Sequence, residues 1–350
     1  MRSANVGGRV NWGKGCGGGH AQGARPAAGV SIRTVTRALA GAADVGAATR
    51  ARVEKIARET GYRPDELARS LKLRRGYGVA VVVHRPDELS FEKVCALERE
   101  LRAAGYTTRL VFNGGGAAEE AALLAEALAQ RVAAVAVFTA ASSAAEAAHL
   151  EALHKSGHPY VLVDRRPSRA LDTVLIDRPA GVAGAVGRLA DGGHRQVFYL
   201  GPEGRERTDG FLRAFAERGL RPPQGWKLSA GLTASAESGR AAGAALLALR
   251  PEATAVFAYS DIFAYGVMAG LAASGAPVPE RVSVVGFDDR LPSRFVSPPL
   301  STVAHPHEEV GRLAAEVLLG KLGGRIRPGE GTRTAVPRYV ERSSTRSLKS

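Results

Sequence analysis

The first ordered pattern along the chain is a pair of short helices. Ser31 is a typical N-cap residue, and apolar residues follow it at helical spacing up to Leu39. A second helix is predicted over residues 47–60, and Gly61 ends it as a C-cap. A third short helix is predicted over residues 65–72 behind a proline that suits a helix start. These helices predict a small all-α head followed by a linker.

From residue 78 the pattern changes to short apolar runs that alternate with longer helical stretches. The uninterrupted run Val79–Val83 is typical of a strand that is buried on both faces. Helices are predicted over residues 91–104 and 117–130. Further strands are expected near residues 108–112, 133–138, 160–164, 196–200, 254–258 and 282–287. This alternation over 260 residues predicts an α/β body of two lobes, each a mainly parallel sheet flanked by helices.

Several classes of protein are disfavoured by composition. Cys16 and Cys95 are too few for a disulfide framework or a structural zinc site. No stretch of about 18 apolar residues predicts a transmembrane helix. Residues 1–28 are rich in Gly and Ala, contain no acidic residue and lack the apolar core of a secretory signal. We therefore expect a cytoplasmic protein with an irregular segment at residues 1–28.

Positive charge is concentrated at the start of the chain. The formal net charge is +14, and residues 1–75 carry 15 Lys and Arg against 5 Asp and Glu, which is +10 of that total. A basic head on a nearly balanced body favours a nucleic-acid-binding module. A solvated basic tail would have the same charge, so composition alone leaves both interpretations open.

The sequence GVSIRTVTRAL, residues 29–39, has the turn-then-helix pattern of a helix-turn-helix. Its helix would present short polar and basic side chains, which can reach base edges in a major groove about 12 Å wide. An ordinary pair of packed helices would show a similar pattern. Enzyme signatures are missing: there is no GxxxxGK[ST], GxSxG or HExxH. We therefore expect a binding protein that is not an enzyme and needs no cofactor.

These residues resemble the DNA-binding head of the LacI/GalR family of bacterial transcription regulators. The head matches in GVSIRTVTRAL and TRARVEKIARETGYRPDELARSLK, and the body matches in VDRRP, GPEGRERTDGF, VVGFDD and PPLSTVAHPHEEVGRLAAEVLL. The resemblance covers about residues 29–340. It implies a helix-turn-helix head, a hinge helix and an effector-binding body of the periplasmic-binding-protein type.

The resemblance also implies domain boundaries. The head would comprise residues 29–63, the hinge helix and linker 64–77, and the body 78–343. Lobe 1 would contain residues 78–176 and 304–331, and lobe 2 residues 177–303 and 332–343. The implied protein is a homodimer, and a repressor rather than an activator. A periplasmic-type ligand-binding protein remains an alternative.

The resemblance assigns DNA contacts within the head. Ile32 and Arg33 would face base edges at the start of the recognition helix. Leu71 would enter the minor groove as an apolar wedge that kinks the duplex. The other implied contacts to bases, phosphates or the minor groove are Ser31, Thr34, Thr36, Arg37, Thr49, Tyr62, Ala68 and Lys72. Ala40 and Gly46 stand where the family often has Asn and Ser, and each removes a possible hydrogen bond.

The largest departure from the family lies just before the helix-turn-helix pattern. The family's first helix should occupy about residues 19–28, but GHAQGARP at 19–26 places glycines and a proline there. Codons can be chosen for these residues that, read one nucleotide later with one G restored before Ala27, encode VTLKELAR. This gives a first helix of the family's type. The hypothesis is that residues 1–26 are out of frame, and resequencing the start of the gene tests it. A regulator with a defective head is therefore a second alternative.

The resemblance implies effector binding by Arg207 and by four residues at strand ends: Asp164, Ser260, Asp261 and Asp288. Strand ends are where ligand sites of α/β proteins gather. Charged Asp and Arg side chains suit the paired hydroxyls of a sugar-like effector. The alternative for each Asp is a helix N-cap. Ser260 stands where sugar-binding members often have Asn, which leaves the effector open. His305 and His307 are interpreted as packing residues rather than metal ligands.

Overall fold

The computed structural model describes residues 30–39, 45–60, 78–84 and 86–349, and the chain divides into two compact units at residue 77. The first unit contains α2 (Ile32–Leu39) and α3 (Ala47–Thr60). The hydroxyl of Ser31 caps α2 by accepting the backbone N–H of Thr34 at 3.1 Å. A small apolar core joins the two helices and consists of Val30, Val35, Ala38, Val45, Val53 and Ile56. Both helices lie where the sequence pattern predicts them. The expected hinge helix at 65–72 lies outside the described residues.

Lobe 1 of the second unit contains a six-stranded parallel sheet in the order β11-β5-β4-β3-β1-β2. Its strands are β1 (Gly78–His84), β2 (Thr107–Asn113), β3 (Ala134–Phe138), β4 (Tyr160–Val163), β5 (Thr173–Ile176) and β11 (Arg333–Ala335). Its helices are α5 (Glu88–Ala103), α6 (Ala117–Ala129), η1 (Ala145–Ala147), α7 (Ala148–Lys155) and α12 (His307–Leu322). Alternate residues of β1 pack against α5 and α12 on one face of the sheet and against α6 and α7 on the other.

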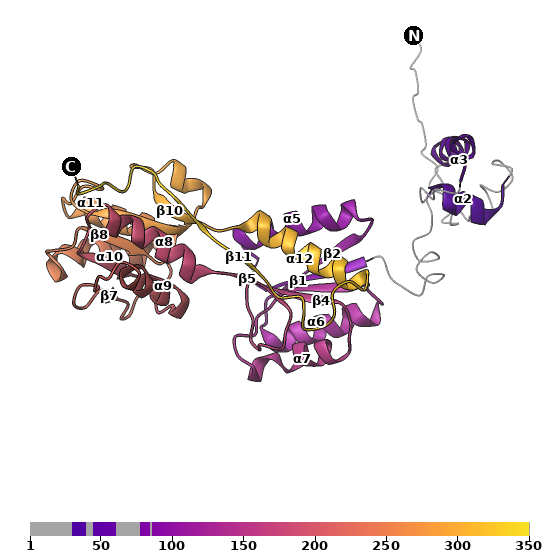
Figure 1. Ribbon diagram of the computed structural model, residues 1–350, viewed down its shortest axis with the longest axis horizontal. Coiled ribbons are helices and arrows are strands. Elements are labelled where there is room, and N and C mark those ends of the chain that lie inside the picture. Colours follow the sequence, from indigo (N-terminus) through magenta and orange to yellow (C-terminus); the bar gives the residue numbers. More distant parts are fainter. Residues whose placement is uncertain (1–29, 40–44, 61–77, 85, 350) are drawn as a thin grey trace, which may run out of the picture. The chain divides into compact units, whose positions relative to one another are not determined.

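Lobe 2 repeats this arrangement with strand order β12-β10-β9-β8-β6-β7, in which only the β10–β12 pair is antiparallel. Its strands are β6 (Val197–Leu200), β7 (Lys227–Leu228), β8 (Ala255–Ala258), β9 (Ser283–Asp288), β10 (Ser301–Ala304) and β12 (Arg338–Val340). Its helices are α8 (Arg178–Asp191), α9 (Arg205–Ala216), α10 (Ala236–Leu249), α11 (Asp261–Ala273) and η2 (Leu291–Arg294). Helices α8 and α9 cover one face of the sheet, and α10 and α11 cover the other (Figure 1). The predicted two-lobed α/β class is therefore confirmed.

The chain passes between the lobes three times, and two expected boundaries of lobe 2 differ from the structure. The passages lie between β5 and α8, between β10 and α12, and between β11 and β12. Residues 333–335 were expected in lobe 2, but they pair with β5 and therefore belong to lobe 1. Lobe 2 also continues beyond residue 343, because the buried Ser344 hydroxyl donates to the carbonyl of Val284 at 2.6 Å. Three-residue strands have no periodicity that would reveal these boundaries.

Glycines allow the close packing of α10 on α11. A Cβ on Gly266 would collide with the carbonyl oxygen of Ala236 and the backbone nitrogen of Arg240. Gly243 faces the backbone of Val267 in the same way. The two helices therefore meet backbone to backbone, and any larger side chain at these positions would push them apart.

Candidate functional site

The lobe junction, where the three passages bring the ends of both sheets together, is centred on Asp164. This residue follows β4 with a φ of +73°. Its carboxylate accepts from Lys93 Nζ of α5 at 2.7 Å and from Arg178 Nη2 of α8 at 2.5 Å. Burial alone would raise the pKa of Asp164, but the two cations hold it well below its usual range. Asp164 therefore stays ionised and ties lobe 1 to lobe 2.

Two histidines stack beside this ion pair. The rings of His305 and His307 lie 4.4 Å apart and nearly parallel. The Nε2 atom of His305 is 3.9 Å from the carboxylate of Asp164. Burial lowers the pKa of His305 far below its usual range and that of His307 to about 4. The described residues contain no group of three or more His, Cys, Asp or Glu side chains that could hold a metal ion. The two rings pack against each other as neutral groups.

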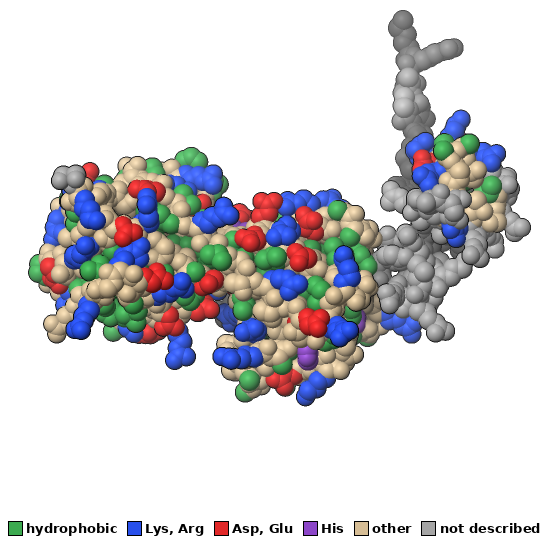
Figure 2. Space-filling model, viewed as in Figure 1, with side chains coloured by type: hydrophobic (Ala, Val, Ile, Leu, Met, Phe, Trp, Pro, Cys, Tyr) green, Lys and Arg blue, Asp and Glu red, His purple; other side chains and the backbone are tan. Residues whose placement is uncertain are grey.

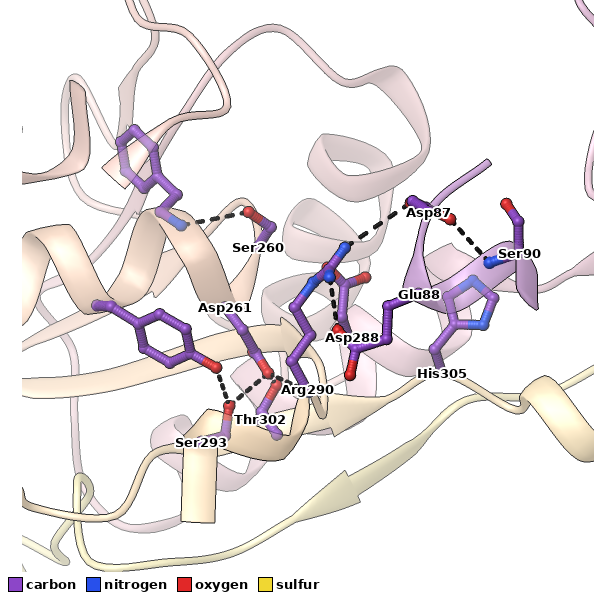
Figure 3. Close-up of polar contacts among 12 residues, drawn as sticks. Asp87, Glu88, Ser90, Ser260, Asp261, Asp288, Arg290, Ser293, Thr302 and His305 are labelled. Atoms are coloured by element: carbon purple, nitrogen blue, oxygen red, sulfur yellow. Dashed lines mark hydrogen bonds and ion pairs between the residues drawn. The ribbon is translucent and has the colours of Figure 1, made fainter. Parts of the chain in front are cut away.

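Ser260 and Asp261 stand at the start of helix α11, but their side chains make different contacts. Ser260 is the N-cap, and its hydroxyl accepts the backbone N–H of Phe263 at 3.4 Å. The fully buried carboxylate of Asp261 accepts from Thr302 Oγ1 at 2.5 Å, from Ser293 Oγ at 2.6 Å and from the Arg290 N–H at 2.8 Å (Figure 3). Asp261 thus joins three segments of lobe 2 and is occupied by protein donors.

Asp288 and Arg207 have fewer hydrogen-bond partners among the described residues than Asp261 has. Asp288 ends β9 with a φ of +124° and is 7% exposed. Its burial raises its pKa to about 7; nearby Asp261 adds to the rise, while Arg207 and Arg290 oppose it. The Arg207 guanidinium lies over the ring of Tyr259 at 4.2 Å and over that of Phe287 at 4.6 Å. Among the described residues, the buried Nε of Arg207 has no hydrogen-bond partner.

Arg290 connects Asp288 with the opposite lobe. Its Nε lies 3.8 Å from the Asp288 carboxylate, and its Nη1 donates to Glu88 Oε2 at 2.9 Å. Its Nη2 also lies 3.8 Å from Asp87, the N-cap of α5. Figure 3 shows Arg290 between Asp288 and the start of α5. This is the second ionic tie across the junction.

Sequence reasoning missed Lys93, Arg178 and Arg290. Each contacts a residue in another element of the fold: Lys93 and Arg178 pair with Asp164 at separations of 71 and 14 residues, and Arg290 pairs with Glu88 at 202. Lys93 gave the one usable signal, because a charged residue stood on the apolar face of a predicted helix, four positions before Leu97.

The structure describes only some of the head residues that are expected to contact DNA. Ser31 and Arg37 are exposed, while Thr34 and Thr49 are half-buried. The side chains of Ile32, Arg33 and Thr36 are not described, and Tyr62, Ala68, Leu71 and Lys72 lie outside the described residues. Figure 2 shows several Lys and Arg side chains on the head together with acidic ones, and both signs of charge are also interspersed over the visible face of the body. No helix in the described part of the chain is long and apolar enough to span a membrane.

Fold and site define a helix-turn-helix head joined to a two-lobed binding body. Residues 186–345 match the family model described as a periplasmic binding protein-like domain. Residues 25–65 match the model of bacterial regulatory proteins of the lacI family. The chain belongs to the LacI family, because relatives at least 30% identical align over most of its length.

Two curated relatives are transcription regulators. The chain is 30% identical over 326 residues to the HTH-type transcriptional repressor CytR of Escherichia coli K12, covering 91% of this chain and 94% of CytR. It is 32% identical over 311 residues to the HTH-type transcriptional regulator CelR of Thermobifida fusca, covering 85% of this chain and 90% of CelR. The chain is accordingly a regulator of transcription.

Solved structures share the architecture. A complex of the transcriptional regulator CelR with cellobiose superposes with a TM-score of 0.66 at 28% identity, covering 93% of this chain and 99% of the other. The lac repressor dimer bound to operator and the anti-inducer ONPF gives a TM-score of 0.76 at 24% identity, covering 92% and 98%. The second likeness supports the fold alone.

Proposed function

We propose that this chain is a sequence-specific repressor whose affinity for operator DNA is controlled by a sugar or sugar derivative bound at the lobe junction. It acts in the cytoplasm as a homodimer, and it works by binding rather than by catalysis. The observation that carries the effector site is the pair Arg207 and Asp288. Both have ionisable side chains, both stand at the junction, and the Nε of Arg207 has no protein partner among the described residues.

The chemistry of this pair suits a polyol. A carboxylate accepts hydrogen bonds from hydroxyl groups, and a guanidinium donates several from a rigid fork. The Tyr259 and Phe287 rings fix the plane of Arg207, so its donors are pre-oriented. Opposite charges on one ligand site favour a neutral molecule with both donors and acceptors over a simple anion. The cellobiose bound by the related regulator CelR is a ligand of this class.

Ligand binding would act on DNA through the arrangement of the lobes. The ion pairs Asp164–Arg178 and Arg290–Glu88 hold the two lobes in one arrangement. A ligand that contacts both lobes prefers one arrangement, and by linkage it shifts operator affinity only to the extent of that preference.

Exposed apolar side chains support pairing with a second copy. Lobe 1 exposes Phe91 on α5 and Phe112 on β2, and lobe 2 exposes Leu291 and Phe295 at η2, each to more than half of its surface. Large exposed apolar residues of this kind mark interaction surfaces. A dimer would also present two heads to a pseudo-palindromic operator.

Operator binding and effector binding are tested separately on the full chain. Double-stranded DNA selected from a random pool should bind with a steep negative dependence on salt. Thermal-shift screening should include cellobiose, D-ribose, other neutral sugars and purines. Leu71→Ala should weaken operator binding and leave sugar affinity unchanged, and Leu249→Ala, exposed in lobe 2, is the control. Equal loss of both activities in Leu71→Ala would contradict the hinge assignment.

A second candidate is a regulator whose head no longer binds DNA. The observation that favours it is the segment GHAQGARP, which is incompatible with the family's first helix. This candidate predicts sugar binding without selection of any DNA sequence. Restoring VTLKELAR at residues 19–26 should then restore operator binding.

A further inference from the structure

Two consecutive residues at the proposed effector site have backbone conformations that side chains disfavour. Asp288 has a φ of +124° and Asp289 a φ of +56°, and neither is glycine. Residues in such conformations persist only where surrounding contacts hold them, and they concentrate at functional sites. The turn after β9 therefore needs an external restraint to keep Asp288 in place.

The restraint comes from Arg342, 53 residues further along the chain. Its Nη2 donates to Asp289 Oδ1 at 2.5 Å, and its Nη1 donates to the carbonyl of Leu300 at 2.7 Å. The side chains of Arg342 and Asp289 are only 14% and 16% exposed, so solvent screens this pair little. One guanidinium thus connects the strained turn with the segment that enters β10.

Arg342 is itself firmly held, because the chain after β12 lies along lobe 2. Its backbone N–H donates to Ser301 Oγ at 2.8 Å. Two residues later, the buried Ser344 hydroxyl accepts the N–H of Ser301 at 2.7 Å and donates to the Val284 carbonyl at 2.6 Å. The restraint is therefore fixed to both β9 and β10.

We propose that Arg342 is a positioning residue for effector binding: it holds the Asp288–Asp289 turn so that the Asp288 carboxylate stays at the lobe junction. The proposal rests on the proposed function, because Asp288 is assigned to the effector there. Arg342 would affect ligand binding indirectly, through the backbone conformation of the Asp288–Asp289 turn. The competing view is that the charge of Arg342 acts only on the overall stability of lobe 2.

The conformation of the Asp288–Asp289 turn can be followed without a ligand, through one backbone hydrogen bond. The backbone N–H of Arg290, directly after the turn, donates to Asp261 Oδ2 at 2.8 Å. If the turn relaxes, this bond breaks and the Arg290 amide loses its protection from hydrogen exchange. Amide exchange is measured by NMR on the full chain for Arg342→Ala and for Arg346→Ala, an exposed arginine of the same C-terminal segment. We expect about a tenfold loss of protection at Arg290 in Arg342→Ala and none in Arg346→Ala.

Strain relief separates positioning from general stabilisation. Glycine adopts positive φ readily, so Asp289→Gly removes both the ion pair and part of the need for it. Combined with Asp289→Gly, Arg342→Ala should cause little further loss of protection at Arg290. The proposal is overturned if Arg342→Ala leaves protection unchanged, or if its effect is equally large with Asp289→Gly. If Arg342→Ala unfolds lobe 2 as a whole, Asp289→Ala decides instead: loss of protection at Arg290 supports the proposal, and unchanged protection overturns it.

Binding is measured on the same variants with cellobiose and D-ribose as probes. Arg342→Ala should weaken the binding of whichever probe the unmodified chain binds by about tenfold, and Asp289→Gly should recover part of this loss. A normal affinity in Arg342→Ala would overturn the proposal. If the unmodified chain binds neither probe, the ligand class proposed above loses its support from these sugars, whereas the exchange data still decide the role of Arg342.

Discussion

Asp164 and Arg178 lie in different lobes, and the carboxylate of one is 2.5 Å from the guanidinium of the other. Asp164 follows a strand of lobe 1, and Arg178 begins the first helix of lobe 2. Lys93 donates to the same carboxylate, so two cations share one anion in a mostly buried place. Any change in the arrangement of the lobes must alter this contact.

Asp164→Asn should destabilise the protein. The substitution leaves Lys93, which is 4% exposed at its side chain, without its anion, and an unpaired buried charge is costly. Because Arg178 and Asp164 keep partial access to water, we expect a loss of about 2–3 kcal/mol in the free energy of unfolding, measured by urea denaturation.

Asp191→Asn is the matched control for that experiment. Asp191 also pairs with an arginine, Arg218, but its side chain is 56% exposed. Exposed ion pairs contribute at most about 1 kcal/mol. Equally small losses in the two variants would show that the Asp164 site is as well screened as the surface.

Arg290→Ala should loosen the second tie between the lobes. Arg290 bridges Asp288 of lobe 2 to Glu88 of lobe 1, and alanine removes both contacts. Spin labels on Cys95 in lobe 1 and on Glu252→Cys in lobe 2, with Cys16→Ser, should give a longer and broader distance distribution. Arg294→Ala, in the short helix η2 that follows Arg290, is the control. An unchanged distribution would mean that Arg290 does not restrain the lobes.

The sequence predicted most of the strands that bury long apolar runs, and it missed β10, whose burial is polar. Val79–Val83 is an uninterrupted apolar run that consists mostly of β-branched Val, so its strand was foreseeable. Strand β10 begins with Ser301 and Thr302, which are fully buried only because Arg342, Ser344 and Asp261 bond their hydroxyl or backbone groups. No local pattern predicts such a strand.

The site residues differ in the same way: some follow from a local apolar pattern, and others depend on distant polar contacts. Asp288 was foreseeable, because it ends an apolar strand where ligands of α/β proteins bind. Arg290 and Arg342 depend on partners more than 50 residues away. Their roles follow from tertiary contacts, which one sequence does not show.

Gly266→Ala should destabilise lobe 2, whereas Gly184→Ala should stabilise it. Both glycines lie within helices, where alanine is normally favoured by about 0.5–1 kcal/mol. A Cβ at Gly184 meets open space, but at Gly266 it would collide with the backbone of α10. We expect a loss of about 1–3 kcal/mol for Gly266→Ala because of overpacking. Thermal unfolding of the two variants measures the difference, and a gain in both would disprove the tight contact between α10 and α11.

Asp288→Asn should raise the stability of the protein, and more at pH 8 than at pH 5. The pKa of Asp288 is about 7 in the folded chain, against about 3.9 for an unperturbed Asp. Between these values the folded state binds more protons than the unfolded state, so this group makes stability fall as pH rises towards 7. Asparagine cannot ionise, so Asp288→Asn removes this loss of stability at higher pH.

The unfolding temperature at the two pH values measures this effect, with Glu203→Gln, 72% exposed at its side chain, as control. The same Asp288→Asn variant should lose sugar binding, because the carboxylate is the proposed acceptor for the ligand hydroxyls. Increased stability together with lost binding would show that the buried acid is retained for its ligand and at the expense of the fold. A gain in unfolding temperature of equal size at pH 5 and pH 8 would instead mean that Asp288 does not titrate between them, and that its burial is compensated by its neighbours Arg207 and Arg290.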